Sequence, residues 1–333
     1  MNAFLQNGIK QSAPVVALAA VLAGAGWLSG CVLGPGASGE FDRTFTVNGP
    51  VHLEVANGSG NVKVTAGAAG EVRVHGEIHT RQWGSDGDQS TVNQLRSNPP
   101  VSQDGNLIRI GSSDRRLSHT SIDYTVEVPT DAEIHGSTGS GDVEFDGIHG
   151  PATFSSGSGN ITADSIASDV QVKTGSGDLE LEEIQGQTLA ESGSGNIKIH
   201  TAKGAVRVGT GSGDVVITQP GDNVIAETGS GDIEVENATA DLRLQTGSGT
   251  IKVGGNPGAM NYWDIHSGSG DVTLNVPQTA SFRLYAHTGS GGINAQMPVV
   301  MEGTAGKHEL RARIGDGKAR VEIGTSSGTI ELR

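Results

Sequence analysis

The chain has 333 residues and a net charge of −15, from 22 Lys and Arg against 37 Asp and Glu. Nucleic acids and anionic lipids both bind basic surfaces, so this acidity argues against either as the main partner. Glycine accounts for 52 residues, roughly twice its usual share. The glycines do not recur at every third position, which excludes a collagen triplet and points to many tight turns.

The first thirty residues are typical of an export signal. An apolar stretch over residues 13–28 follows Lys10 and is short for a membrane span, but it suits a signal-peptide core. The stretch ends in Leu28-Ser29-Gly30-Cys31, which resembles a bacterial lipobox. The resemblance implies removal of residues 1–30 and a lipid anchor on Cys31. In a bacterium with two membranes it further implies sorting to the outer membrane.

Cys31 is the only cysteine and therefore has no internal disulfide partner. An ordinary signal peptide with an incidental cysteine is the alternative. Residues 31–40 include Gly34-Pro-Gly-Ala-Ser-Gly39 and are expected to form a short tether.

An irregular β region is expected over residues 41–137. Alternating apolar residues predict strands at 51–55, 61–65, 71–78, 107–110 and 122–128. Residues 88–96 fit either a short helix or a loop, and Pro129 ends the last strand.

A strict repeat follows. The tetrapeptide Thr/Ser-Gly-Ser-Gly begins at intervals of 18 residues and then twice at intervals of 21; its starts are Thr138, Ser156, Thr174, Ser192, Thr210, Thr228, Thr246, Ser267 and Thr288. A variant begins at Thr325, and an isolated early copy spans Asn57–Gly60. A fixed period of this kind indicates stacked repeats.

Counted from Thr138 as position 1, apolar residues fall at positions 6 and 8 and again at 15 and 17, with one more at position 11. Two such alternating runs predict two short strands per repeat. One unit cannot bury its own apolar face, so the units must stack. The sequence therefore predicts an all-β fold, a parallel β-solenoid (β-helix) with two-strand coils of about 18 residues over 138–333. The Gly-Ser-Gly corner is attributed to the tolerance of glycine for positive φ.

Two related solenoids do not fit the pattern. A hexapeptide β-helix needs an apolar residue at every sixth position, but His149 and Ser155 follow Val143 at those steps. Calcium-binding nonapeptide solenoids need an Asp in the glycine turn of both half-coils, and only one half has it here.

Stacking places equal positions of successive coils side by side. Position 5 is a column of mainly Asp and Asn that includes Asp142, Asn160, Asp178 and Asn196. We expect these residues to cap the turns, with weak cation binding as the alternative. No tight metal site and no cofactor are predicted. At position 7 the column sets Glu180 beside Lys198 and Glu234 beside Lys252, as complementary pairs that fix the register.

The two longer coils break this uniformity. If coils stack in chain order, Asp241, Tyr262 and Arg283 form one outward column, and Arg243, Asp264 and Tyr285 form the next. Tyr and Arg are enriched at interaction hot spots. The candidate binding patch is therefore Arg243, Tyr262, Arg283 and Tyr285. The alternative is that the aromatic residues only cover the edge of a longer loop.

Other expectations are structural. Trp263 is expected to point inward and fill the widened core. Four charged residues are expected to protect the last, exposed edge of the solenoid, namely Lys318, Arg320, Glu331 and Arg333.

No catalytic constellation is apparent, and an enzyme is not expected. His75 and His79 are four residues apart on a predicted strand, about 13 Å, too far to share a metal ion. The serines of the Gly-Ser-Gly turns repeat identically, which suits architecture better than a unique nucleophile. A column of stacked acidic residues, Asp146, Asp164 and Glu182, is similar to those of carbohydrate-active β-helices. Those enzymes generally also have a basic residue in the cleft, and no such cluster is found here.

Several segments resemble the bacterial putative-adhesin family of β-strand-repeat proteins, also called the DUF4097 family. They are the run from Val51 to Val64, the strand Tyr124–Pro129 and the repeated Gly-Ser-Gly-Asp-Ile/Val turns. The resemblance covers residues 41–333 and implies a surface or periplasmic repeat protein with no catalytic residues to carry over.

The expected function is a non-enzymatic, lipid-anchored envelope solenoid that acts in adhesion or as a scaffold through its strand faces. Its partners would be the membrane, through the anchor, and a surface glycan or an envelope protein, but not nucleic acid. One alternative is a periplasmic partner in envelope stress or cell-wall maintenance, with the front end (Gly70–Asp123) binding a protein. A polysaccharide-active β-helix enzyme is the other. The ligand, the handedness, the periplasmic or surface location and the oligomeric state stay open at this point.

Overall fold

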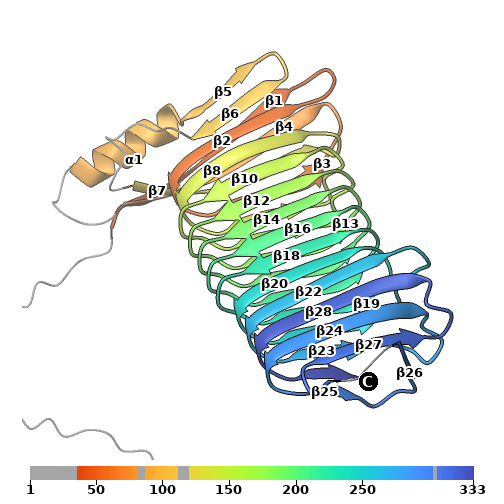
Figure 1. The fold of residues 1–333 in the computed structure, drawn as a ribbon. Coiled ribbons are helices and arrows are strands. Elements are labelled where there is room, and N and C mark those ends of the chain that lie inside the picture. The colour runs from red at the N-terminus through yellow and green to blue at the C-terminus, as the bar shows by residue number, and fades with distance from the viewer. Residues whose placement is uncertain (1–35, 81–86, 112–119, 303–305) are drawn as a thin grey trace, which may run out of the picture. The chain divides into compact units, whose positions relative to one another are not determined.

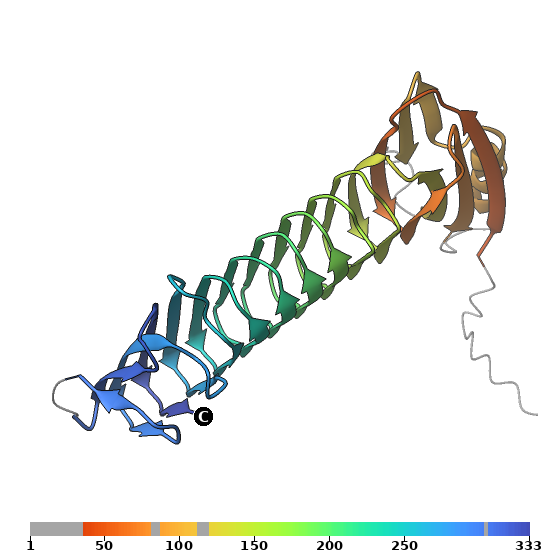
Figure 2. The same cartoon turned by 90° about the vertical axis from the view of Figure 1, so that its right-hand side faces the viewer.

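The computed structural model describes residues 36–80, 87–111, 120–302 and 306–333. The chain divides into two units, Met1–Gly34 and Pro35–Arg333, and all described residues belong to the second. This second unit is a stack of coils in which two long sheets face each other (Figures 1 and 2). An all-β parallel solenoid is therefore confirmed.

The regular coils place one strand in each sheet. In one sheet, which we call sheet A, the coil strands are β3 (Val62–Gly67), β9 (Val143–Asp146), β11 (Ile161–Asp164), β13 (Leu179–Ile184), β15 (Ile197–Ala202), β17 (Val215–Pro220), β19 (Ile233–Ala238), β21 (Ile251–Gly255) and β23 (Val272–Asn275). In the other, sheet B, they are β2 (His52–Ser59), β8 (Glu133–Ser140), β10 (Ala152–Ser156), β12 (Val170–Thr174), β14 (Thr188–Ser192), β16 (Val206–Thr210), β18 (Val224–Thr228), β20 (Leu242–Ser248) and β22 (Tyr262–Ser269).

Neighbouring coils pair in parallel with the register that the repeat predicts. Ile161 lies opposite Leu179, one period on, and Glu180 lies opposite Lys198. The inward side chains at the two alternating runs are buried between the sheets, as is the position-11 side chain at the corner. Trp263 points inward as expected and is fully buried, and its indole Nε1 donates a hydrogen bond to the carbonyl of Ala240 (2.7 Å).

The early Gly-Ser-Gly copy belongs to the stack. Strand β2 pairs in parallel with β8, with Asn57 opposite Thr138, and β3 pairs in parallel with β9. The regular coil over residues 133–146 therefore stacks directly on the coil formed by β2 and β3, although more than 60 residues separate them in sequence.

The N-terminal end of the stack carries additional, partly antiparallel strands. They are β1 (Ser38–Thr46), β4 (Glu71–Thr80) and β7 (Thr120–Pro129) in sheet A, and β5 (Val101–Asp104) and β6 (Leu107–Gly111) in sheet B. The segment that fitted a helix or a loop is helix α1 (Gly87–Ser97), which packs against β1 and β4 through buried Val92 and Leu95. Because β1 begins at Ser38, the last residues of the expected tether lie in a strand.

The C-terminal end departs from chain order. The remaining strands are β24 (Phe282–Ser290), β25 (Ile293–Ala295), β26 (Val300–Met301), β27 (Glu309–Ile314), β28 (Ala319–Ser327) and β29 (Ile330–Leu332). In sheet B, β28 lies between β22 and β24, and in sheet A, β29 lies between β23 and β25. The last coil of the chain is thus inserted between the two coils that precede it in sequence.

This insertion corrects the expectation about the last edge of the solenoid. Lys318, Arg320, Glu331 and Arg333 do not protect an exposed edge, because β28 and β29 are interior strands. At the C-terminal end, the edge strand of sheet B is instead β26, which pairs antiparallel with β27, and β27 pairs antiparallel with β24. The apolar residues of β28 alternate with polar ones, as in the other strands of sheet B, so one face of β28 is buried between the sheets.

Candidate functional site

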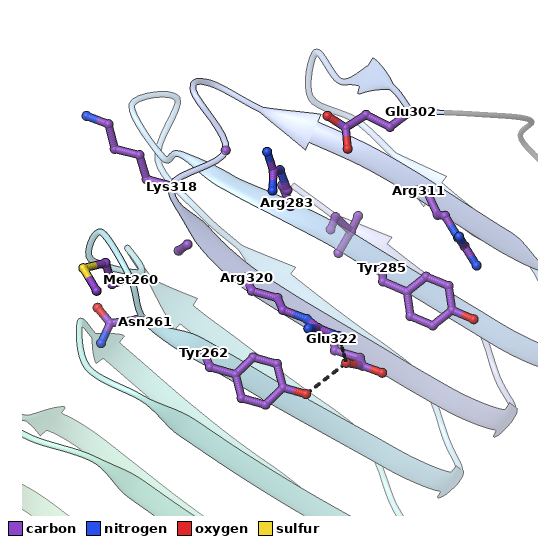
Figure 3. A pocket seen from close by; sticks show the side chains of 13 residues that line it. Met260, Asn261, Tyr262, Arg283, Tyr285, Glu302, Arg311, Lys318, Arg320 and Glu322 are labelled. Atoms are coloured by element: carbon purple, nitrogen blue, oxygen red, sulfur yellow. Dashed lines mark hydrogen bonds and ion pairs between the residues drawn. The ribbon is translucent and has the colours of Figure 1, made fainter.

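A groove of about 750 Å³ lies on the outer face of sheet B at the C-terminal coils (Figure 3). Its walls come from β22, β28, β24 and β27, together with the turn at residues 317–318; the lining residues are Met260, Asn261, Tyr262, Arg283, Leu284, Tyr285, Glu302, Arg311, Gly317, Lys318, Ala319, Arg320 and Glu322. Three of the four residues of the predicted binding patch therefore line one groove.

The predicted stacking within that patch is wrong. Tyr262 lies opposite Arg320 rather than Arg283, and Arg320 in turn lies opposite Arg283. In the next column, Glu322 stands between Asp264 and Tyr285 in the same way. The inserted strand β28 separates residues that chain-order stacking would have made direct neighbours.

Tyr262 is held by residues of the inserted strand. Its hydroxyl donates a hydrogen bond to Glu322 Oε2 (2.9 Å), and the Arg320 guanidinium carbon lies 5.4 Å from the ring centroid. Partial burial raises the pKa of the Tyr262 hydroxyl, and the hydrogen bond to Glu322 adds to this effect. The hydroxyl therefore remains a protonated donor at neutral pH.

Tyr285 forms a second aromatic contact with an arginine. The guanidinium carbon of Arg311 lies 5.0 Å from its ring centroid, and the His287 ring stacks beside it at 5.7 Å. Arg311 also bonds Glu309 through Nε (2.8 Å), and this hydrogen bond raises the pKa of Arg311. The groove thus has two tyrosines, each with an arginine over its ring.

Arg243 lies outside the groove. It sits on β20, opposite Asp264, on the side of β22 away from β28. Conversely, sequence reasoning missed Arg311, Arg320 and Glu322 as groove residues. The alternation of Arg320 and Glu322 with apolar residues showed that they point outward, but the insertion that brings them to the patch has no local signal in the sequence.

Exposed apolar side chains also gather at this end. The large hydrophobic residues that are exposed among the described positions are Met260 (92% exposed), Tyr262 (39%), Val300 (54%) and Met301 (40%). Met260 and Tyr262 line the groove, and the other two form the edge strand β26.

The position-5 column caps the coils from outside. Each Asx oxygen accepts the backbone N–H of the same position in the next coil, as from Asn160 to Asp142 (2.9 Å) and from Asp178 to Asn160 (2.8 Å). The expected capping role is confirmed, with the difference that the bond joins two coils. Within the described residues, no cluster of three His, Cys, Asp or Glu side chains could hold a metal ion.

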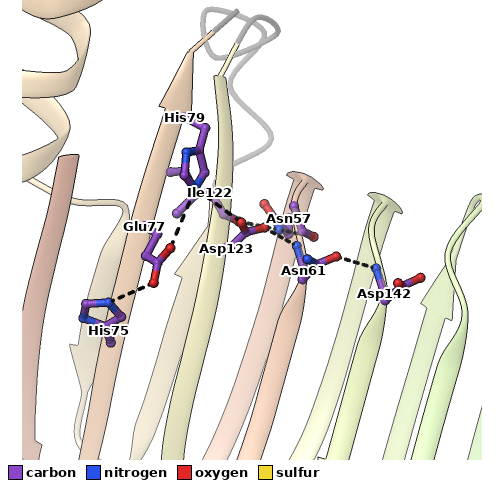
Figure 4. A network of polar contacts seen from close by, with 9 residues as sticks. Asn57, Asn61, His75, Glu77, His79, Ile122, Asp123 and Asp142 are labelled. Carbon is purple, nitrogen blue, oxygen red and sulfur yellow. Dashed lines mark hydrogen bonds and ion pairs between the residues drawn. The ribbon is translucent and has the colours of Figure 1, made fainter. Parts of the chain in front are cut away.

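The position-5 column, or Asx ladder, continues into a polar network on the N-terminal strands (Figure 4). Asp123 accepts the N–H of Asn61 (2.6 Å) and lies 3.5 Å from His79, and Glu77 lies between His79 and His75 at 3.8 and 3.6 Å. A hydrogen bond to Asp42 raises the pKa of His75. The two histidines thus meet at one carboxylate.

Cys31 and the apolar stretch before it lie outside the described residues. In the part of the chain that is described, no helix is long and apolar enough to cross a membrane.

Fold and groove together define a β-solenoid repeat protein with an arginine- and tyrosine-lined surface groove. A sequence model of the family described as Toastrack DUF4097 matches residues 50–229 and 222–333. The chain belongs to this family, as the repeated turns had indicated.

Similar solved structures are described as adhesion proteins. A "putative cell adhesion protein" from Clostridium sporogenes is 11% identical, with 89% of this chain and 99% of that chain covered and a TM-score of 0.23. A "putative adhesin" from Bacteroides fragilis is 14% identical, with 89% and 97% covered and a TM-score of 0.37. Another from Parabacteroides merdae is 13% identical, with 88% and 96% covered and a TM-score of 0.27. A search of curated proteins finds no significant match.

Proposed function

We propose that this protein is an adhesin-like binding protein of the bacterial envelope and that it binds its ligand in the groove at the C-terminal coils. The observation that carries the proposal is the concentration of Tyr262, Tyr285, Arg283, Arg311 and Arg320 in one groove. Tyr and Arg contribute most of the binding energy at many interfaces, because they combine large contact areas with directional hydrogen bonds.

A binding screen against envelope glycans and envelope proteins tests the proposal. The purified full chain is compared with Tyr262→Ala/Tyr285→Ala and with the control Gln171→Ala/Gln245→Ala, whose residues lie on strands β12 and β20 of the same sheet outside the groove. We expect at least about a tenfold loss of binding for the tyrosine pair only, since hot-spot residues typically contribute about 2 kcal/mol each. Equal binding by all three proteins would overturn the groove as the site.

A second candidate surface lies at the front end. A cavity of about 610 Å³ is lined by residues of β1 and α1, among them Asp42, Arg43, Asn93 and Arg96. This cavity favours the alternative function, a periplasmic partner that binds a protein through residues 70–123. Loss of protein binding on Asn93→Ala/Arg96→Ala, with the tyrosine pair unaffected, would establish it.

We further propose that the mature chain begins at Cys31 and is anchored to the membrane by lipid on that residue. The support is the sequence Leu28-Ser29-Gly30-Cys31 after an apolar stretch. Radiolabelled palmitate should label the wild-type protein and not Cys31→Ala, while Ser38→Ala keeps the label. A wild-type protein without label would refute the anchor.

A further inference from the structure

Three arginines form a continuous row across the groove end of sheet B. Arg320 on β28 lies opposite Arg283 on β24, and Arg283 lies opposite Arg313 on β27. Tyr262 on β22 continues the row on one side of Arg320. Neighbouring strands are about 4.8 Å apart, so the three arginines lie in one line on the same outward face, and Arg313 stands just beyond the residues that line the groove.

Such a row is unfavourable for folding. Like charges directly opposite each other on neighbouring strands destabilise a sheet. The outer two arginines have carboxylate partners, since Arg320 lies 3.2 Å from Glu322 and Arg313 lies 3.3 Å from Glu302. The central Arg283 makes no hydrogen bond or ion pair within the described residues. It is exposed, and Figure 3 shows it among the residues that line the groove.

The turn before β28 holds this row in place. Gly317 has a φ of +70°, and a Cβ there would lie 3.0 Å from Arg313 and 3.1 Å from Arg283, so the turn backbone packs on both aliphatic stems. Ser281 fixes the turn, because its Oγ accepts the N–H of Asp316 (3.0 Å). The stems are therefore ordered before any ligand arrives, which lowers the entropic cost of binding.

The charge around the row differs from that of the rest of the solenoid. Residues 138–279 contain 19 Asp and Glu against 6 Lys and Arg, whereas residues 280–333 contain 5 against 7. A long polyanion such as nucleic acid would be repelled along the acidic coils. Of these two stretches, the one with the C-terminal groove offers a short acidic segment the more favourable potential.

We propose that the arginine row binds the carboxylates of an acidic polysaccharide, with Arg283 as the central contact. The proposal rests on the proposed function and names the ligand class of its groove. A guanidinium group binds a carboxylate through two parallel hydrogen bonds. One sugar residue of a linked uronate chain is about as long as the strand spacing, so successive sugars can follow the row. The hydroxyl of Tyr262 and the amide of Asn261 supply partners for sugar hydroxyls.

Calorimetric titration of the purified full chain in non-ionic detergent tests this proposal. The probes are oligogalacturonate, the same oligosaccharide with its carboxylates methyl-esterified, a sulfated oligosaccharide, inorganic phosphate and an oligoglutamate peptide. We expect binding of oligogalacturonate that weakens with added salt, and at least about tenfold weaker binding of the ester, because the charged hydrogen bonds are lost.

Two variants separate the row from general charge. Arg283→Gln should lower the affinity for oligogalacturonate by about tenfold or more, whereas Arg243→Gln, which removes a cation from the same face outside the groove, should change it less than about twofold. Thermal unfolding of Arg283→Gln is the folding control. The variant should unfold no earlier than wild type, because the substitution relieves repulsion between arginines.

The proposal fails if oligogalacturonate does not bind, if the ester binds equally well, if Arg283→Gln binds as wild type does, or if the peptide, the sulfated sugar or phosphate binds more tightly. In each of these cases the proposed function can still hold. A neutral glycan or a protein that binds and is lost with Tyr262→Ala/Tyr285→Ala would keep the groove as the site and refute only the acidic ligand. Loss of all groove-dependent binding in the screen would refute both.

Discussion

At the scale of single residues, Tyr124 has a hydroxyl group that is buried in the core. The residue lies on β7 in the core of the N-terminal coils, with its ring edge-on to Phe41 at 6.3 Å between centroids. Its hydroxyl has no hydrogen-bond partner within the described residues, and burial raises its pKa well above the ordinary value. A buried polar atom without a partner costs free energy of folding.

Tyr124→Phe should therefore raise the free energy of unfolding by about 1 kcal/mol. Chemical denaturation measures the change, and Tyr124→Leu is the control, which should destabilise the protein because it removes the aromatic packing. A lower stability for Tyr124→Phe would show that the hydroxyl is satisfied in solution.

The pair of His75 and Asp42 makes stability depend on pH. Their Nδ1 and Oδ1 atoms are 2.8 Å apart, and this hydrogen bond raises the pKa of His75 in the folded state. A raised folded pKa means that the contribution is present below the unfolded pKa of about 6.5 and is lost as the pH rises through the folded value.

Asp42→Asn should consequently destabilise the protein more at about pH 5 than at about pH 8.5. Denaturation at the two pH values gives the comparison, and Asp104→Asn on β5 is the control, for which we expect no such difference. An effect of the same size at both pH values would exclude a charged His75 as its cause.

At the scale of elements, the glycines of the repeated turn are required for a reason other than the positive φ that the sequence suggests. In the regular coils Gly159, Gly177 and Gly195 do not have positive φ. A Cβ at Gly195 would instead lie 1.8 Å from the carbonyl oxygen of Gly177 in the preceding coil. The expectation of positive φ at this corner is thus wrong for the regular coils, and close stacking of backbones explains the glycines.

Positive φ occurs at the opposite corner. At position 10 of successive coils it is adopted by Gly147 and then by side-chain-bearing residues, namely Ser165, Glu183, Thr201, Gln219 and Asn237. The hydroxyl that opens each Gly-Ser-Gly turn is buried, and from Thr174 onward it bonds the neighbouring coil, as from Thr174 Oγ1 to the Gly159 carbonyl (2.9 Å). The serine between the glycines is exposed.

Gly195→Ala should therefore lower the free energy of unfolding by about 3 kcal/mol or more, since the stacked backbone must shift. Gly209→Ala on β16 is the matched control. Its Cβ would meet nothing closer than 4.0 Å, and we expect a gain of about 0.5 kcal/mol from the lower entropy of the unfolded chain. Thermal and chemical denaturation compare the two, and equal effects would contradict the stacking explanation.

At the scale of the whole described unit, the central coils and the C-terminal strands differ in whether the rest of the protein can fold without them. A central coil contacts only its two neighbours, so its removal leaves two matching surfaces. Strands β28 and β29, by contrast, each pair on both sides with strands that precede them in sequence. The last residues of the chain therefore hold the C-terminal coils together.

Deletion of residues 174–191 should leave a folded protein, because it joins equivalent positions and sets Asn160 beside Asn196 in the Asx ladder. Truncation after residue 317 should release β24 and β27 from sheet B and abolish the groove. Hydrogen exchange would show lost protection over 282–314 in the truncated protein and normal protection in the deletion variant. Retained protection after truncation would mean that the interior position of β28 is not required.

The sequence by itself determined the repeat, the two strands per coil and the register, because periodic apolar residues can be buried only by stacking. It also located Tyr262, Arg283 and Tyr285 as outward residues of the longer coils. These conclusions depend on spacing along the chain, which is readable without a structure.

Only the tertiary structure decided the order of coils at both ends. That order sets Asn57 beside Thr138, places Arg320 between Tyr262 and Arg283, and leaves Arg243 outside the groove. Every coil offers nearly the same two strand edges, so the apolar pattern within a coil does not determine which coil it pairs with. The choice is made by the fit of whole coils and by the loops that connect them, and it is this choice that assembles the arginine row.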